Sequence, residues 1–233
     1  MDLKKNGLAR SAAGRGFTLI ELLVVISIIL IVSSVIFVGG NGGSGAKLSS
    51  AQRIASGVAQ GARGQAILKG APVRILIYTD SSTNNEDEKK LRYFGMVYGD
   101  LDAPLDAGGD PTKWIAATQG TMLPDGIYFN PELSASKWSA GSVPTMKLEY
   151  PRLNSVSEGA GDEYYYYGFN SNGTMDRGFN NAWMALQAGS LLPNGQSMEV
   201  DFSEPENEYL VAGLIFRRVG TTTLVSDPES IVP

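Results

Sequence analysis

A single carboxylate stands inside the most apolar stretch of the chain. Between residues 17 and 38 the polar side chains are few, and Glu21 is the only charged one. As an α-helix this stretch would rise about 33 Å, roughly the thickness of the hydrocarbon core of a bilayer. A carboxylate costs about 2.5–3.5 kcal/mol at mid-bilayer, so we expect Glu21 to have a partner. No Lys, Arg or His follows it before Lys47, but a cut between Gly16 and Phe17 would create an ammonium group four residues away.

The residues around that position resemble a known processing site. The similarity to the site at which type IV pilin precursors are cut rests on Gly16-Phe17-Thr18-Leu19-Ile20-Glu21-Leu22-Leu23. The resemblance implies that a membrane prepilin peptidase cuts after Gly16 and methylates the new N-terminal Phe17. It also implies that Glu21 pairs with the N-terminal amine of a neighbouring subunit during filament assembly. Residues 1–16 would then be a leader peptide, and 17–38 a transmembrane and assembly helix.

Two simpler interpretations of the N-terminus stand beside this one. A secretory signal peptide has a basic start, but its apolar core is only about 7–15 residues long, shorter than the run here. Residues 43–46 could nevertheless serve as its small-residue cleavage site. A single-pass anchor would place the basic N-terminus inside, yet such an anchor has no need of Glu21. The basic residues in question are Lys4, Lys5, Arg10 and Arg15.

Four aspartates crowd one stretch of the chain, at Asp100, Asp102, Asp106 and Asp110. Oxygen ligands at alternating positions suit Ca²⁺, and some major pseudopilins of the same superfamily hold calcium in a loop. The spacing matches no EF-hand pattern, and the glycines and prolines among the aspartates are typical of an exposed turn. A solvated acidic loop is therefore the favoured interpretation, with calcium as the alternative.

The elements that carry these residues follow from periodicity. Residues 39–45 are rich in glycine and predict a break in the helix. An apolar stripe with helical spacing then predicts an amphipathic helix over 46–70, ended by Gly70 and Pro72. Residues 71–233 read as short strands with turns between them, including a hairpin over 73–98 and another over 210–225. Residues 131–144 are predicted to be a loop. Alternation along Tyr164 to Tyr167 predicts two tyrosines in the core and two on a solvent face.

Parts of this region resemble the GspH/FimT group of minor pseudopilins and minor pilins. The similarity lies in Ala62-Arg63 followed by Pro72-Val73-Arg74-Ile75, in Leu123-Pro124-Asp125-Gly126-Ile127 and in Phe169-Asn170-Ser171-Asn172-Gly173-Thr174. It implies an α+β, pilin-like fold in which a long N-terminal helix, half transmembrane and half amphipathic, packs on an antiparallel β-sheet domain.

Arg217 and Arg218 are candidate DNA contacts through the same resemblance, because some FimT-like pilins bind DNA through arginines near the C-terminus. Residues 1–16 hold four of the 19 Lys and Arg but one of the 24 Asp and Glu, so the chain after Gly16 would carry a net charge of −8. An acidic surface repels nucleic acid. Structural salt bridges for both arginines are therefore the favoured interpretation, and nucleic acid is not an expected partner.

The composition excludes several function classes. Cysteine and histidine are both absent, which removes disulfides, the commonest metal ligand and the commonest general base. The sequence contains no nucleophile–base pair, phosphate-binding loop or metal-ligand spacing. We therefore expect a protein that is not an enzyme and has no cofactor.

The resemblance as a whole implies a minor pseudopilin, a structural subunit of the type II secretion pseudopilus. Its partners would be prepilin peptidase, other pilin or pseudopilin subunits and an inner-membrane assembly platform. It would cross the bacterial inner membrane once, with its C-terminal domain in the periplasm, and enter a filament on assembly. A minor type IV pilin for adhesion, motility or DNA uptake is the alternative, and a membrane-anchored binding module that never polymerises is a further one.

Overall fold

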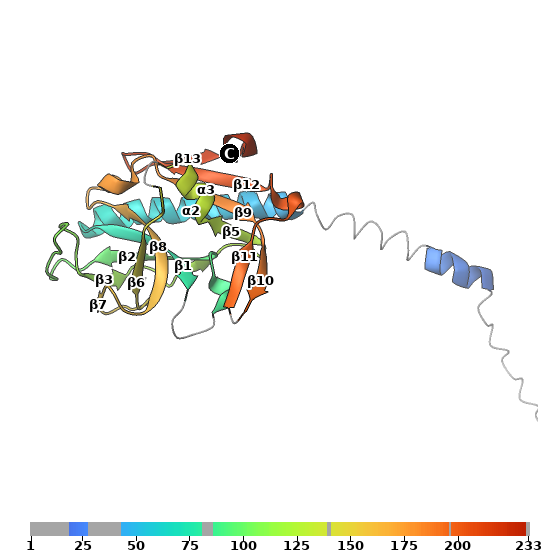
Figure 1. Cartoon of the computed structure of the whole chain (residues 1–233), viewed down its shortest axis with the longest axis horizontal. Helices are drawn as coiled ribbons and strands as arrows, with labels where there is room; N and C mark the ends of the chain where they lie inside the picture. Colours follow the sequence, from blue (N-terminus) through green and yellow to red (C-terminus); the bar gives the residue numbers. More distant parts are fainter. Residues whose placement is uncertain (1–18, 28–42, 81–85, 139–140, 196, 232–233) are drawn as a thin grey trace, which may run out of the picture. The chain divides into compact units, whose positions relative to one another are not determined.

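The computed structural model describes residues 19–27, 43–80, 86–138, 141–195 and 197–231. The chain divides into two compact units, residues 1–43 and 44–233. In the first unit, residues 19–27 form a helix whose large apolar side chains are all exposed. The second unit is an α+β domain with antiparallel sheets (Figure 1), as predicted. A continuous long N-terminal helix stays a prediction, because residues 28–42 lie outside the described ranges.

The strands of the second unit form three sheets in the described residues, and every strand pair is antiparallel. The seven-stranded sheet has the order β6-β8-β1-β2-β3-β7, with β4 paired to β2; the four-stranded sheet has the order β13-β12-β9-β5, and β10 pairs with β11. The helices are α2 (Gly43–Lys69) and α3 (Pro131–Ser136). The strands are β1 (Val73–Asp80), β2 (Tyr93–Gly99), β3 (Lys113–Ala116), β4 (Thr121–Met122), β5 (Ile127–Asn130), β6 (Thr145–Leu148), β7 (Val156–Ser157), β8 (Asp162–Phe169), β9 (Trp183–Ala188), β10 (Ser190–Asn194), β11 (Ser197–Asp201), β12 (Val211–Phe216) and β13 (Thr222–Val225).

The helix α2 packs along both main sheets and shares one hydrophobic core with them (Figure 1). Its buried face is made mostly of alanines, among them Ala55, Ala59 and Ala62. Small side chains let the helix backbone approach the strands closely, and the bulk of the core comes from the aromatic and aliphatic side chains of the sheets. Gln52 adds a polar contact, because its amide donates hydrogen bonds to the backbone carbonyls of Gly213 and Val225 at 2.9 Å each.

The central strands of the seven-stranded sheet are buried on both faces. Along β1, Val73 and Ile75 belong to the core that contains α2, whereas Leu76 belongs to a second core on the opposite face. Tyr167 and Tyr164 of β8 divide in the same way. The alternation predicted for the tyrosines is present, but the prediction that two of them face solvent is wrong. On the second face these side chains pack with others from β3, β6 and β7 of the same sheet and from the segment between β6 and β7, namely Trp114, Met146, Leu148, Val156 and Tyr150.

The buried tyrosines are neutral. Burial raises the pKa of Tyr93 to about 12, and it raises the pKa of Tyr164 and Tyr167 further. Tyr167 donates a hydrogen bond from its hydroxyl to the Trp183 carbonyl at 2.6 Å. The run of tyrosines is therefore packed into the protein, with the Tyr167 hydroxyl satisfied, and is not an exposed stacking platform for bases or sugars.

One arginine connects the loop that contains the four aspartates to the second core, the one that contains Leu76. Arg74 of β1 is 6% exposed and lies between the rings of Trp114 and Tyr166, at 4.2 and 4.3 Å from the ring centroids. Its guanidinium also pairs with Asp110 and Glu158, at 2.9 Å each. The two rings and two carboxylates compensate the cost of burying the guanidinium charge. Asp110 therefore has a structural role.

Three details differ from the sequence-based expectation. The helix α2 begins at Gly43, three residues earlier than predicted; residues 39–42 lie outside the described ranges, where the break stays a prediction. The predicted loop 131–144 contains α3, which starts with a proline and is capped by Asn130, whose side chain accepts a hydrogen bond from the Leu133 amide. The strand β10, which contains Pro193, was not among the predicted strands.

The alanine face of α2 can be tested by adding volume. Ala62 is fully buried, so Ala62→Leu should lower the free energy of unfolding by about 1–3 kcal/mol through overpacking. Gly57→Ala is the control on the same helix, because a methyl group there meets nothing within 4 Å and should stabilise by about 0.5–1 kcal/mol. Urea unfolding of the detergent-solubilised chain measures both, and Ala62→Leu unfolding like the wild type would show that α2 is not closely packed.

Candidate functional site

The N-terminal processing residues lie at the edge of what the structure describes. Gly16 and Phe17 fall outside the described residues, and Glu21 lies in the helix at 19–27, where it is exposed. Its apolar neighbours are exposed too, from Leu19 at 81% to Val25 at 46%. A row of exposed apolar side chains needs lipid or protein to cover it. No helix within the described ranges is both long and apolar enough to cross a membrane.

In the second unit, three segments meet at two glycines. The turn between β12 and β13 packs on the turn after β8, and a hydrogen bond from the Met175 amide to the Arg218 carbonyl joins them at 3.0 Å. Gly220 has a φ of +80°, and a Cβ at that position would lie 1.8 Å from the Gly173 carbonyl oxygen. A Cβ on Gly173 would in turn lie 2.8 Å from the side chain of Ile67 on α2. Only glycine permits this approach of the two turns and the helix.

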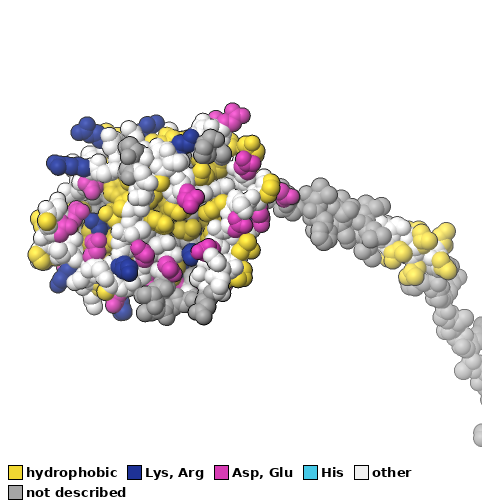
Figure 2. Space-filling view, viewed as in Figure 1, with side chains coloured by type: hydrophobic (Ala, Val, Ile, Leu, Met, Phe, Trp, Pro, Cys, Tyr) yellow, Lys and Arg dark blue, Asp and Glu magenta, His cyan; other side chains and the backbone are white. Residues whose placement is uncertain are grey.

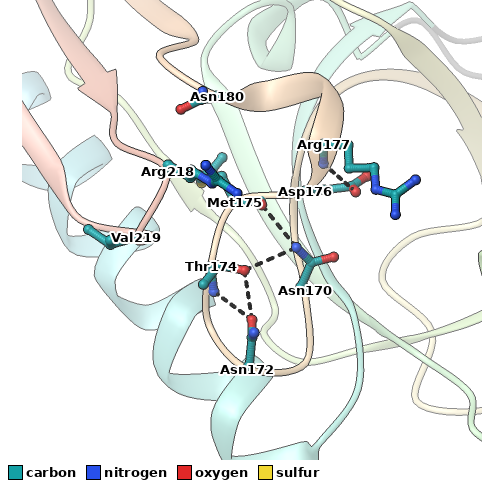
Figure 3. Close-up of a pocket in the computed structure, with 9 residues that line it drawn as sticks. All are labelled: Asn170, Asn172, Thr174, Met175, Asp176, Arg177, Asn180, Arg218 and Val219. Carbon is teal, nitrogen blue, oxygen red and sulfur yellow. Dashed lines mark hydrogen bonds between the residues drawn. The ribbon is translucent and has the colours of Figure 1, made fainter.

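The first of two cavities opens beside this junction and measures about 520 Å³ (Figure 3). Three of the lining residues are joined by hydrogen bonds. Asn172 accepts from the Thr174 amide and hydroxyl, and Asn170 donates to the Thr174 hydroxyl. Arg218 reaches in from the β12–β13 turn, and Arg177 lies at the rim and points away. The lining residues are Asn170, Asn172, Thr174, Met175, Asp176, Arg177, Asn180, Arg218 and Val219.

The second cavity measures about 530 Å³ and is lined by α2 and the same turn. Its one charged residue is Arg63, which passes over the glycine junction; the arginine Cδ lies 3.3 Å from the Cβ position of Gly220. Arg63 Nε is buried and has no hydrogen-bond partner in the part of the chain that the structure describes. A buried guanidinium nitrogen without an acceptor is costly, and a bound anion or carboxylate would supply one.

Both predicted arginines lie at this junction. Arg217 is exposed and donates to the Thr223 hydroxyl at 3.1 Å and to the Asn181 side-chain oxygen at 3.4 Å. Neither Arg217 nor Arg218 takes part in a salt bridge with any described residue, and the expectation of structural salt bridges stays a prediction. The side-chain hydrogen bonds of Arg217 go to neutral groups, and Arg218 lines the first cavity together with Asp176.

The side chains of three of the four aspartates, Asp100, Asp106 and Asp110, make contacts within the protein. The hydroxyl of Ser155 donates to Asp100 and lowers the pKa of that carboxyl. Asp106 accepts from the amides of Gly108 and Asp110, and the hydrogen bond from the Asp110 amide is the main cause of its lowered pKa. Within the described ranges no three acidic side chains are grouped as a metal site requires. The calcium interpretation therefore has no support in the geometry of Asp100, Asp102, Asp106 and Asp110.

Four arginines, Arg63, Arg177, Arg217 and Arg218, lie around the two glycines and are called the basic junction below. Sequence reasoning missed two of them. Arg63 was noted only as part of a helix motif and Arg177 not at all, because they lie far from Arg217 and Arg218 in sequence. One signal was available: Arg63 interrupts the small residues of α2, and Gly173 and Gly220 are the kind of residue that allows segments to approach. Which segments meet depends on the sheet register.

Comparison with known proteins gives one match. Residues 13–37 match the family described as the prokaryotic N-terminal methylation motif. The chain therefore carries a type IV pilin-like prepilin motif, which indicates processing by prepilin peptidase and assembly with other pilin-type subunits. The match covers the N-terminal segment and none of the β-domain. No curated protein and no solved structure matches the chain.

The junction can be tested at Gly220. We expect Gly220→Ala to destabilise strongly, because the new methyl group would overlap the backbone of Gly173 and force the two turns apart. Gly126→Ala is the matched control: its φ of +81° is similar, but a Cβ there meets nothing within 4 Å. The control should cost only about 1–2 kcal/mol of backbone strain, and the Gly220 variant clearly more. Equal unfolding free energies would contradict the close approach.

Proposed function

We propose that the chain is a minor pseudopilin, a structural subunit of a type II secretion pseudopilus. The observation that carries the proposal is the methylation motif at residues 13–37, with Glu21 inside its apolar segment. In this proposal prepilin peptidase cuts after Gly16, methylates Phe17 and leaves the subunit in the inner membrane, with the domain after α2 in the periplasm. The protein is the substrate of that enzyme and catalyses no reaction itself.

Assembly would exchange one apolar environment for another. The side chains exposed on the helix at 19–27 suit lipid before assembly and the helices of other subunits afterwards. Glu21 is expensive in both settings unless a cation accompanies it. The new N-terminal ammonium of Phe17 on a neighbouring subunit would be that cation, so the pairing would make insertion into the filament specific.

A minor type IV pilin fits the same motif, and the GspH/FimT-like segments are compatible with either filament. Deletion of the gene would separate the two. Loss of secretion of folded proteins with normal motility and DNA uptake supports the pseudopilus, and the reverse pattern supports the pilus.

Glu21→Ala should block incorporation into filaments and leave cleavage after Gly16 intact, because it removes the charge that the neighbour's ammonium would pair with. The measurement is the amount of processed chain in sheared or purified filaments compared with the amount in the membrane. Ser27→Ala is the control in the same helix, because the Ser27 hydroxyl already donates to the Leu23 carbonyl at 2.8 Å; it should incorporate normally. Incorporation of Glu21→Ala at the wild-type level would refute the pairing.

A further inference from the structure

The second cavity, between α2 and the β12–β13 turn, places one arginine among neutral residues. Arg63 is its one charged lining residue, and the others are Gln60, Gly64, Ile67, Gly220, Thr221 and Thr222. The carboxylate of Asp176 belongs to the lining of the first cavity and not of this one. Arg63 also forms no salt bridge with any residue in the described ranges. The charge that faces this cavity is therefore positive.

The two glycines of the junction fix the path of the Arg63 side chain. Its Cγ lies 3.2 Å from the Cβ position of Gly173, and its Cδ lies 3.3 Å from that of Gly220. A side chain on either glycine would therefore crowd the arginine stem. Because the packed stem is already ordered, a ligand that binds the guanidinium would restrict little further side-chain motion, which lowers the entropic cost of binding.

Arg92 shows how the same domain treats an arginine that it uses for its own structure. Its Nε atom is buried without a partner, as that of Arg63 is among the residues that the structure describes. The Arg92 guanidinium nevertheless pairs with the carboxylate of Asp125 and donates to the Leu123 carbonyl at 2.9 Å. A carboxylate brought by a ligand would give Arg63 the kind of ion pair that Asp125 gives Arg92.

The cavity has room for such a ligand and walls of two kinds. It measures about 530 Å³, a volume typical of small-molecule sites. Gly64 lines it, and a Cβ at that position would meet nothing within 4 Å. The hydroxyls of Thr221 and Thr222 are possible hydrogen-bond donors, whereas the Ile67 side chain provides apolar surface. A ligand that fits has one polar end and a short apolar part.

We propose that this cavity is a binding site for a carboxylate carried on a short, partly apolar body. A planar guanidinium binds a carboxylate through two parallel hydrogen bonds, and one arginine balances one negative charge. Arg63 is half-buried, so the carboxylate meets the accessible end of the guanidinium. A small rotation of the side chain then brings Nε to the second carboxylate oxygen and gives that buried atom an acceptor.

The charge of the chain favours a single carboxylate over a polyanion. The formal net charge is −5, which repels nucleic acid and polyphosphates, and one lining arginine does not neutralise a phosphate dianion. Figure 2 shows several Lys and Arg side chains at the edge of the second unit where Figure 1 places β13, so the potential there suits one negative charge. The site lies wholly within the second unit, and the inference is independent of which filament the chain enters.

The test titrates the detergent-solubilised full chain with small probes at constant ionic strength and follows binding by ligand-observed NMR. N-acetylglutamate N-methylamide presents a carboxylate as a protein chain does, and monomethyl glutarate presents it as a free acid. N-acetylglutamine N-methylamide is the neutral control. We expect the capped glutamate to bind at least about tenfold more tightly than the capped glutamine, because the neutral amide cannot form the charged pair.

Two variants of α2 test the position of the site. Arg63→Met keeps an unbranched stem over the glycines and removes the charge. Gly64→Leu fills the cavity, because a helical side chain points toward the preceding turn, here toward Gln60. Each should weaken binding of the capped glutamate at least about tenfold. Gly57→Leu is the matched control, because Gly57 is equally open on the same helix and does not line the cavity; it should bind like the wild type.

Urea unfolding of each variant shows whether it is folded, and we expect Gly64→Leu to be at least as stable as the wild type because leucine favours the helix. Binding of the capped glutamate alone would assign the site to an acidic side chain of another protein, and binding of monomethyl glutarate as well would assign it to a free acid. Either result supports the proposal.

Equal affinity for the capped glutamate and the capped glutamine overturns the proposal. So does tighter binding of inorganic phosphate, or binding that Arg63→Met or Gly64→Leu leaves unchanged. Processing at Gly16 and incorporation into filaments are measured separately, so a negative result here leaves the proposed function as it stands.

Discussion

The structure of the domain depends on the burial of an alanine-rich helix between two sheets. Because α2 offers mostly methyl groups, such as Ala59 and Ala62, both sheets can approach its backbone, and their large side chains fill one common core. The same contact fixes where everything else lies. It sets β12 in the same direction as the helix and places the β12–β13 turn beside Arg63, in the C-terminal half of α2.

Local chemistry made much of this predictable. The spacing of small residues over 46–70 indicated α2, Gly70 marked its end, and the hairpins over 73–98 and 210–225 were visible as paired β-branched runs. What depended on long-range packing was not predictable. The outer face of β8 looks solvent-exposed in sequence, because Trp114 and the residues that cover it lie far away. Only part of the basic junction could be predicted from the sequence, for the same reason. Arg217 and Arg218 are adjacent in sequence, whereas Arg63 lies near them only in the folded protein.

The account assigns the two parts of the chain separate tasks. The N-terminal segment carries the prepilin motif, whose chemistry is that of a processing site and one carboxylate in an apolar run. Among the residues that the structure describes, the domain after it contains no metal cluster, and Arg63, Arg177, Arg217 and Arg218 form no salt bridge. Arg74 illustrates the contrast: flanked by two rings and paired with two carboxylates, it is structural. The arginines at the junction form no salt bridge with any residue that the structure describes.

The central claim is that the chain is processed as a pilin-type subunit, and the N-terminus of the protein from its native membrane tests it most directly. Intact mass and the N-terminal peptide should show a chain that begins at N-methylated Phe17. A chain that still begins at Met1 or Asp2, or one cut near Ala46, would contradict the account, because Glu21 would then have no new ammonium group to pair with.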